Sequence, residues 1–151
     1  MEGTCACGAV RYALKTRPMF VNCCHCLDCQ RQTGSAFVIN ALIETDRIEL
    51  SGVAPDPVTV PTDSGRPHDI HRCPTCQLAL WSDYGRRPKL RFVRVGTLVQ
   101  PHAIAPDAHI FTRSKVPWVI LPEGVPAFEI FYELDKQWSP ESLARRKAIL
   151  G

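Results

Sequence analysis

The sequence has no long apolar run and no common nucleotide-binding signature. No stretch approaches the roughly 18 apolar residues that a membrane-spanning helix requires, so we expect no membrane segment. The opening residues Met1–Thr4 include an acid and form no apolar leader, from which we expect a cytoplasmic protein whose thiols stay reduced. A glycine-rich phosphate loop, a nucleophile elbow and the kinase and Rossmann fingerprints are all missing.

Strong charge and internal repetition are also missing. The formal net charge is only +3 over 151 residues, which does not by itself indicate nucleic-acid binding. A basic run from Arg86 to Arg94 contains Pro88, which predicts a turn, so we interpret the run as a solvated hairpin and expect no nucleic-acid partner. No repeat, low-complexity segment or linker divides the chain, and we therefore expect one domain over residues 1–151.

The pattern of apolar residues predicts a mainly β protein. Residues 36–43 are almost continuously apolar, as in a strand buried on both faces, and residues 90–98 predict a further strand. Ser139 as N-cap followed by Pro140 predicts a C-terminal helix over about 139–150. A shorter helical turn is expected after Cys26, ending near Gly34. Other expected strands are 10–14, 48–51, 58–60, 78–81, 109–111 and 128–132.

Cysteine is the residue that this sequence has in excess. Eight cysteines in a protein of a reducing compartment are expected to be metal ligands or reactive thiols rather than disulfides. The segment Cys23–Cys29 places four thiols and an imidazole in seven consecutive positions. Neighbouring cysteines cannot face each other as a disulfide requires. Thiolates at such short spacing instead favour a soft metal such as zinc.

The first group of cysteines combines Cys5-x-Cys7 with Cys73-x-x-Cys76. Four thiolates fill the coordination of a tetrahedral zinc and leave no position for a substrate. Gly8 would allow the chain to bend so that both sulfurs of the tighter pair face one metal. Such a zinc would close a long loop and constrain the unfolded chain. The alternative is that the first two cysteines are free, buried thiols.

The second group is Cys24, Cys26 and Cys29. Three thiolates leave a fourth position open, as in catalytic zinc sites, and a soft metal there favours a thiol substrate. Cys23 could replace Cys24, but Cys24-x-Cys26 repeats the spacing of the first group, so we prefer it. His25 is expected beside the metal rather than on it, or at the surface. The alternative is a second structural zinc that Cys23 or His25 completes.

Five segments of this chain occur in the order typical of a known family: Gly3–Tyr12, Cys24–Phe37, Cys73–Cys76, Val95–Leu98 and His109–Trp118. They resemble the glutathione-dependent formaldehyde-activating enzyme family, also called the centromere protein V family. The resemblance implies an Mss4-like fold of folded antiparallel sheets around a structural zinc. It assigns a structural zinc to Cys5, Cys7, Cys73 and Cys76, and an active-site zinc to Cys24, Cys26 and Cys29.

The activity that the resemblance implies is formation of S-(hydroxymethyl)glutathione from formaldehyde and glutathione, which belongs to the carbon–sulfur lyases. The chain departs from the family in two places. Gln77 stands where a glycine usually follows the second cysteine pair, and a residue there is expected to need a positive φ. Val99-Gln100 stands where an acidic pair is common.

Contacts to the substrate are predicted for Arg31, Arg113 and Lys115, because cationic side chains bind the carboxylates of a glutathione-like thiol. Ordinary surface charge or an ion pair is the alternative for each. Asp28 and His25 are general acid–base candidates by proximity alone. His109 is expected either to orient a zinc ligand or to be a structural histidine, and Trp118 is expected in the core. The alternative function is a non-catalytic zinc-binding or interaction module.

Overall fold

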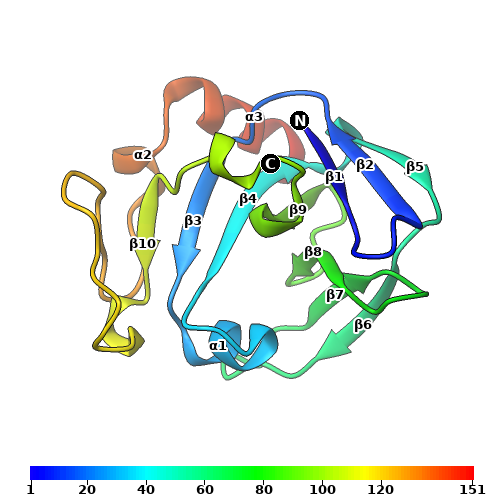
Figure 1. The fold of residues 1–151 in the computed structure, drawn as a ribbon. Helices are drawn as coiled ribbons and strands as arrows, with labels where there is room; N and C mark the ends of the chain where they lie inside the picture. Colours follow the sequence, from blue (N-terminus) through cyan, green and yellow to red (C-terminus); the bar gives the residue numbers. More distant parts are fainter.

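The computed structural model describes all 151 residues and contains two β-sheets (Figure 1). The smaller sheet has the order β1-β2-β5, with strands Glu2–Thr4, Val10–Leu14 and Ile48–Gly52. The larger sheet has the order β10-β3-β4-β9-β8-β7-β6. In chain order its strands are β3 Phe20–Cys24, β4 Val38–Glu44, β6 Asp56–Val60, β7 His68–Arg72, β8 Ala79–Tyr84, β9 Leu90–Arg94 and β10 Ala108–Ile110.

The mainly β architecture is therefore confirmed, with one departure from the expected antiparallel arrangement. All neighbouring strands run antiparallel except β10, which pairs in parallel with β3. The predicted strand over 128–132 is wrong. An isolated bridge between His109 and Ala127 stands just before that segment, and the chain then bends at Glu129 and Ile130.

Both predicted helices are confirmed. The C-terminal helix α3 spans Pro140–Leu150, and the Ser139 side chain accepts a hydrogen bond from the backbone N–H of Ser142 as an N-cap should. The shorter helix α1 spans Leu27–Thr33 and ends at Gly34, whose φ of 65° is left-handed. Short helices not predicted are α2 Leu134–Gln137 and the 3₁₀ turns η1 Thr45–Arg47, η2 Val95–Thr97, η3 Pro101–Ala103 and η4 Thr112–Ser114.

Strand β4 is buried on both faces, as predicted, because it separates two apolar clusters. Ala41 and Ile43 belong to the first cluster, which also contains Cys5 and Cys73. Leu42 lies in the second cluster, which also contains Cys24 and Cys29. Successive side chains of a strand point to opposite faces, so one strand can serve both clusters. Figure 1 shows α1 at one end of β3 and β4 and α3 at the other.

Two local expectations are wrong. The strand predicted over 90–98 ends at Arg94, because the next residues turn into η2, where the Leu98 N–H donates to the Val95 carbonyl and the Thr97 hydroxyl donates to the Arg94 carbonyl. Trp118 is not in the core, since it is 74% exposed. It belongs to the long loop after β10, which extends away from the sheet in Figure 1.

Candidate metal centres and the adjoining cavity

The first cysteine group brings two distant turns together. Cys5 and Cys7 lie between β1 and β2, whereas Cys73 and Cys76 lie between β7 and β8. The Sγ atoms of Cys5 and Cys7 are 3.5 Å apart, those of Cys7 and Cys73 are 3.8 Å apart, and all four sulfurs lie within 4.8 Å of one another. None forms a disulfide. A tetrahedral zinc with bonds of about 2.3 Å would set its sulfurs about 3.8 Å apart, so the donor set fits this metal.

The backbone at this group is shaped by two left-handed residues. Gly8 has a φ of 77°, and Gln77 has a φ of 62°, as the departure from the usual glycine predicted. The Gln77 side chain donates to the Pro74 carbonyl over 3.1 Å, which anchors the turn. Burial opposes a charge on Cys5, but the Val10 N–H and the neighbouring thiols outweigh it and lower the pKa of Cys5 to about 6. The group therefore already favours a thiolate.

The second cysteine group, which we call the cysteine trio, lies around the start of α1. Cys24 ends β3, Cys26 is the N-cap of α1, and Cys29 lies in the first turn of the helix. Their sulfurs lie within 4.8 Å of one another. The Cys29 N–H donates to the Cys26 sulfur over 3.3 Å. Hydrogen bonds from the other two thiols and from backbone N–H groups lower the pKa of Cys26 to about 2. Cys26 is half-buried and the other two are buried, so the trio is open on one side.

Cys23 points to the opposite face of β3 and forms a third group with His25 and His109. The Cys23 Sγ is 3.6 Å from His25 Nε2, which is 3.0 Å from His109 Nδ1. All three side chains are buried, and their ligand atoms lie within 4.8 Å of one another. The expectation that His25 could lie at the surface is wrong. Burial, with the nearby His109 and Lys115, lowers the pKa of His25 to about 4, so the ring is neutral at pH 7.

Arg94 is a polar residue of the site that sequence reasoning missed. It was expected in a solvated hairpin, but it is only 7% exposed. Its guanidinium donates to Asn40 Oδ1 over 2.9 Å and to Gln32 Oε1 over 3.0 Å, whereas its Nε has no partner. It also lies beside the Cys29 sulfur, and burial lowers its pKa although the Cys29 thiol opposes that shift.

The sequence contains only a partial signal for the burial of this arginine. Asn40 interrupts the apolar run of β4, Arg94 interrupts the apolar residues of β9, and the two residues face each other in the strand register. A polar residue within each of two apolar strands is typical of a buried hydrogen-bonded pair. The sequence does not show the register, so the two interruptions could not be connected.

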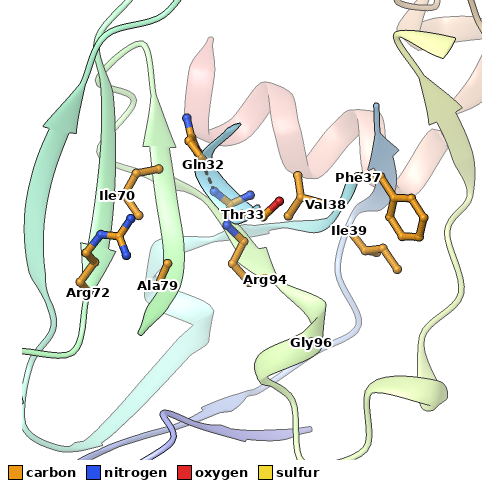
Figure 2. Close-up of a pocket in the computed structure, with 10 residues that line it drawn as sticks. All are labelled: Gln32, Thr33, Phe37, Val38, Ile39, Ile70, Arg72, Ala79, Arg94 and Gly96. Carbon is orange, nitrogen blue, oxygen red and sulfur yellow. Dashed lines mark hydrogen bonds between the residues drawn. The ribbon is translucent and has the colours of Figure 1, made fainter. Parts of the chain in front are cut away.

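A cavity of about 430 Å³ lies beside the trio, lined by α1 and by strands β4, β7, β8 and β9 (Figure 2). Val38 connects this cavity to the trio, because it pairs with Cys24 in the sheet and packs in one apolar cluster with Cys24 and Cys29. The lining residues are Gln32, Thr33, Phe37, Val38, Ile39, Ile70, Arg72, Ala79, Arg94 and Gly96.

None of the three cations predicted to contact the substrate lines this cavity. The Arg31 side chain is 74% exposed and lies 3.6 Å from Asp28. Lys115 Nζ donates to the Val119 carbonyl over 2.6 Å and to the Val116 carbonyl over 3.2 Å. Arg113 is exposed. Their roles stay predictions, and the ion pair of Arg31 and the backbone bonds of Lys115 agree with the plainer alternative of surface charge.

The candidate acid–base residues are also engaged elsewhere. Asp28 accepts a hydrogen bond from the backbone N–H of Asp63 over 3.1 Å and pairs with Arg31. His25 faces Cys23 and His109 rather than the trio. The geometry therefore singles out neither side chain as a proton carrier for chemistry at the trio.

The fold and its cysteine groups define a mainly β protein whose side chains could hold metal ions. The family model described as glutathione-dependent formaldehyde-activating enzyme matches residues 1–114. Because this match covers most of the chain, the protein belongs to the glutathione-dependent formaldehyde-activating enzyme family.

Two further proteins are similar to this chain. A Halomonas elongata protein, provisionally named a glutathione-dependent formaldehyde-activating enzyme, is 29% identical in an alignment 132 positions long that covers 79% of each chain. The crystal structure of a Rhodobacter sphaeroides protein aligns with a TM-score of 0.49 at 22% identity, covering 70% of this chain and 92% of the other. None of the helices described above has the length and apolar character needed to cross a membrane.

Proposed function

We propose that the protein is a zinc-dependent carbon–sulfur lyase that acts on glutathione or a similar thiol and its aldehyde adduct. The observation that carries this proposal is the cysteine trio, whose sulfurs converge beside a cavity and are open on one side. Membership of the family supports glutathione and formaldehyde as the substrates. A reducing cytoplasm would keep both the cysteines and the substrate thiol reduced.

The donor chemistry of the trio fits a catalytic zinc. Three thiolates leave one coordination position for a further ligand, and a soft metal accepts a thiolate there. A zinc ion on Cys24, Cys26 and Cys29 would supply a Lewis acid that keeps the substrate sulfur deprotonated at neutral pH. The chain itself contributes the position of the sulfurs, because the turn into α1 fixes Cys26 and Cys29 on one helical turn after Cys24.

The reaction needs few groups from the protein. The substrate sulfur forms a bond to the formaldehyde carbon while the carbonyl π bond breaks toward oxygen. That oxygen takes a proton and the thiol loses one, so the product is the S-hydroxymethyl hemithioacetal without any change in redox state. Arg94 is the fixed cation beside Cys29 and would offset the negative charge that thiolates bring into a largely buried place.

The four-sulfur group has a different proposed role. A zinc on Cys5, Cys7, Cys73 and Cys76 would be closed to substrates and would fix the β1–β2 turn to the β7–β8 turn. The sulfurs of Cys7 and Cys73 are already in contact across 66 residues of sequence. We assign this zinc to folding and not to chemistry.

The test is to replace Cys26 by serine and to measure zinc per chain and lyase turnover. The variant is expected to lose one zinc and the activity together. Leu27→Ala is the matched control, because Leu27 is the exposed neighbour of Cys26 in α1 and carries no ligand atom. Loss of one zinc from the Cys26 variant with full turnover would rule out the mechanism.

The second candidate function is a non-catalytic zinc module. It is favoured by the burial of Cys24 and Cys29, which are 5% and 7% exposed and restrict access to a metal between them. The two functions predict different responses to glutathione. An enzyme of the proposed class should gain thermal stability when glutathione binds, whereas a closed zinc module should not.

A further inference from the structure

The cavity beside the trio has an unbalanced charge. Two arginines, Arg72 and Arg94, are among its ten lining residues, and no aspartate or glutamate is. In Figure 2 Arg72 and Arg94 lie on either side of Ala79 of β8, and Arg94 extends toward Gln32 of α1. The Cys29 sulfur lies beside Arg94, but no carboxylate of the chain faces the cavity, and two arginines in such a cavity favour an anionic ligand.

Arg94 is already fixed in place to bind such a ligand. Its hydrogen bonds to Asn40 and Gln32 are both to neutral amide oxygens, so they orient the guanidinium without neutralising it. Arg94 takes part in no salt bridge, and its buried Nε has no partner at all. Arg72 donates one N–H to the Gln77 carbonyl and is only half-buried. Guanidinium groups held in this way favour a carboxylate, which they can bind through paired hydrogen bonds.

The rest of the cavity suits the body of a ligand rather than a small aldehyde. Its volume of about 430 Å³ lies in the range of sites that hold whole small molecules. Apolar side chains form much of its wall, and they are Phe37, Val38, Ile39, Ile70 and Ala79. Val38 of the cavity wall pairs with Cys24 in the sheet and packs in one cluster with Cys24 and Cys29, so a molecule whose sulfur lies at the trio could extend its remaining atoms into the cavity.

We infer that this cavity binds the carboxylate-bearing part of the thiol, with Arg94 as the buried cation and Arg72 as the outer one. The site then selects anionic thiols over neutral or cationic ones. The identity of the ligand as a thiol rests on the proposed function, whereas the recognition of a carboxylate rests on the cavity alone. Arg31, Arg113 and Lys115 lie outside the cavity and play no part in this inference.

The test uses S-methylglutathione, which keeps both carboxylates but has no free thiol. It is compared with its diethyl ester, which lacks the two carboxylate charges. Binding to the zinc-loaded full chain is measured by titration calorimetry for the native protein and for Arg72→Gln and Arg94→Lys. Arg11→Gln is the matched control, because Arg11 is an exposed arginine of β2 outside the cavity. Zinc per chain is measured for every variant, so that a loss of metal is not mistaken for a loss of ligand contact.

We expect Arg72→Gln to weaken binding of S-methylglutathione about tenfold and the ester to bind the native protein about tenfold more weakly than the acid. Arg94→Lys keeps the charge but not the paired geometry and should weaken binding severalfold. Equal affinities for acid and ester, or an Arg72→Gln variant that binds the acid as tightly as Arg11→Gln does, would overturn the inference. If S-methylglutathione binds as expected but the protein shows no lyase turnover with glutathione and formaldehyde, the proposed function is wrong and the carboxylate site is still supported.

Discussion

The two cysteine groups use the same side chain for opposite purposes. The four-sulfur group joins residues 66 positions apart, whereas the trio occupies six consecutive residues, Cys24 to Cys29, around one helix start. The first group adds a long-range constraint that the sheets could not provide alone. The second group constrains almost nothing in the fold and leaves one side open. Distance along the chain therefore separates a ligand set that maintains structure from one that is available for chemistry.

The largest effect is expected from breaking the four-sulfur group. Cys73→Ser removes a fully buried ligand at the junction of two turns. We expect the zinc to be lost and the melting temperature to fall by more than about 10 °C, since structural zinc contributes several kcal/mol of folding free energy. Thermal unfolding followed by circular dichroism measures this change. A variant that melts within 2 or 3 °C of the native protein, on the order of 1 kcal/mol, would show that the two groups are not different in role.

Metal removal should separate the two groups without any mutation. A moderate chelator should take the zinc of the open trio first, so turnover should fall by at least about 100-fold while the melting temperature changes little. The zinc of the four-sulfur group should leave only when the protein unfolds. Zinc release and turnover are measured on the same samples over time. Simultaneous release of both zincs would contradict the distinction.

A smaller effect is expected at a site remote from both cysteine groups. Glu44 at the end of β4 accepts two hydrogen bonds from Arg145 of α3, at 2.8 and 2.7 Å, and both side chains are largely buried. Glu44→Gln should reduce the free energy of unfolding by about 2 to 4 kcal/mol, because it leaves Arg145 without its charged partner. Zinc per chain should stay at the native value. Denaturant unfolding and metal analysis together test both parts, and a loss of zinc would mean that stability and metal binding cannot be separated.

The same pair predicts a pH dependence. Burial raises the pKa of Glu44, but the hydrogen bonds and charge of Arg145 outweigh it, so the folded pKa lies below its unfolded value. The pair therefore stabilises the protein fully above the unfolded pKa, near pH 4.5, and this contribution is lost as the pH falls through the lower folded value. The difference in stability between the native protein and Glu44→Gln should accordingly shrink below about pH 4.

The smallest effect is expected within the four-sulfur group itself. Gln77 has a positive φ, which costs a side chain with a Cβ about 1 kcal/mol, although its own bond to the Pro74 carbonyl offsets part of that cost. Gln77→Gly should stabilise the protein by less than about 0.5 kcal/mol after the greater freedom of glycine in the unfolded chain is included. Denaturant unfolding at a fixed zinc concentration measures the change. Destabilisation would show that the side-chain bond matters more than the backbone strain.

Local features of this fold were predictable from the sequence, whereas features that depend on strand register were not. The cap at Ser139 and the turn at Gly34 each follow from a few neighbouring residues, and the positive φ of Gln77 follows from the family resemblance, which puts a glycine there. The burial of Arg94 depends on its pairing with Asn40, 54 residues away, which no local pattern reveals. The exposure of Trp118 likewise depends on where the loop after β10 extends.

The candidate site shows the same division. Spacing alone separated the four-sulfur group from the trio, and the structure brings together the sulfurs within each. Spacing could not predict that Cys23 groups with His25 and His109, because His109 comes from a strand that pairs with β3 only in the folded protein. The cations at the cavity were missed for the same reason, since β7 and β9 bring Arg72 and Arg94 to the same cavity as α1 from distant parts of the chain.

The most direct test of the central claim is zinc X-ray absorption spectroscopy on the fully loaded protein, before and after glutathione is added. A closed group with four sulfurs and an open group with three predict an average of about 3.5 sulfur ligands per zinc in the free protein. Glutathione should raise that average to about 4 as its sulfur fills the open position. An average of 4 before any thiol is added, or no change after it, would contradict the account.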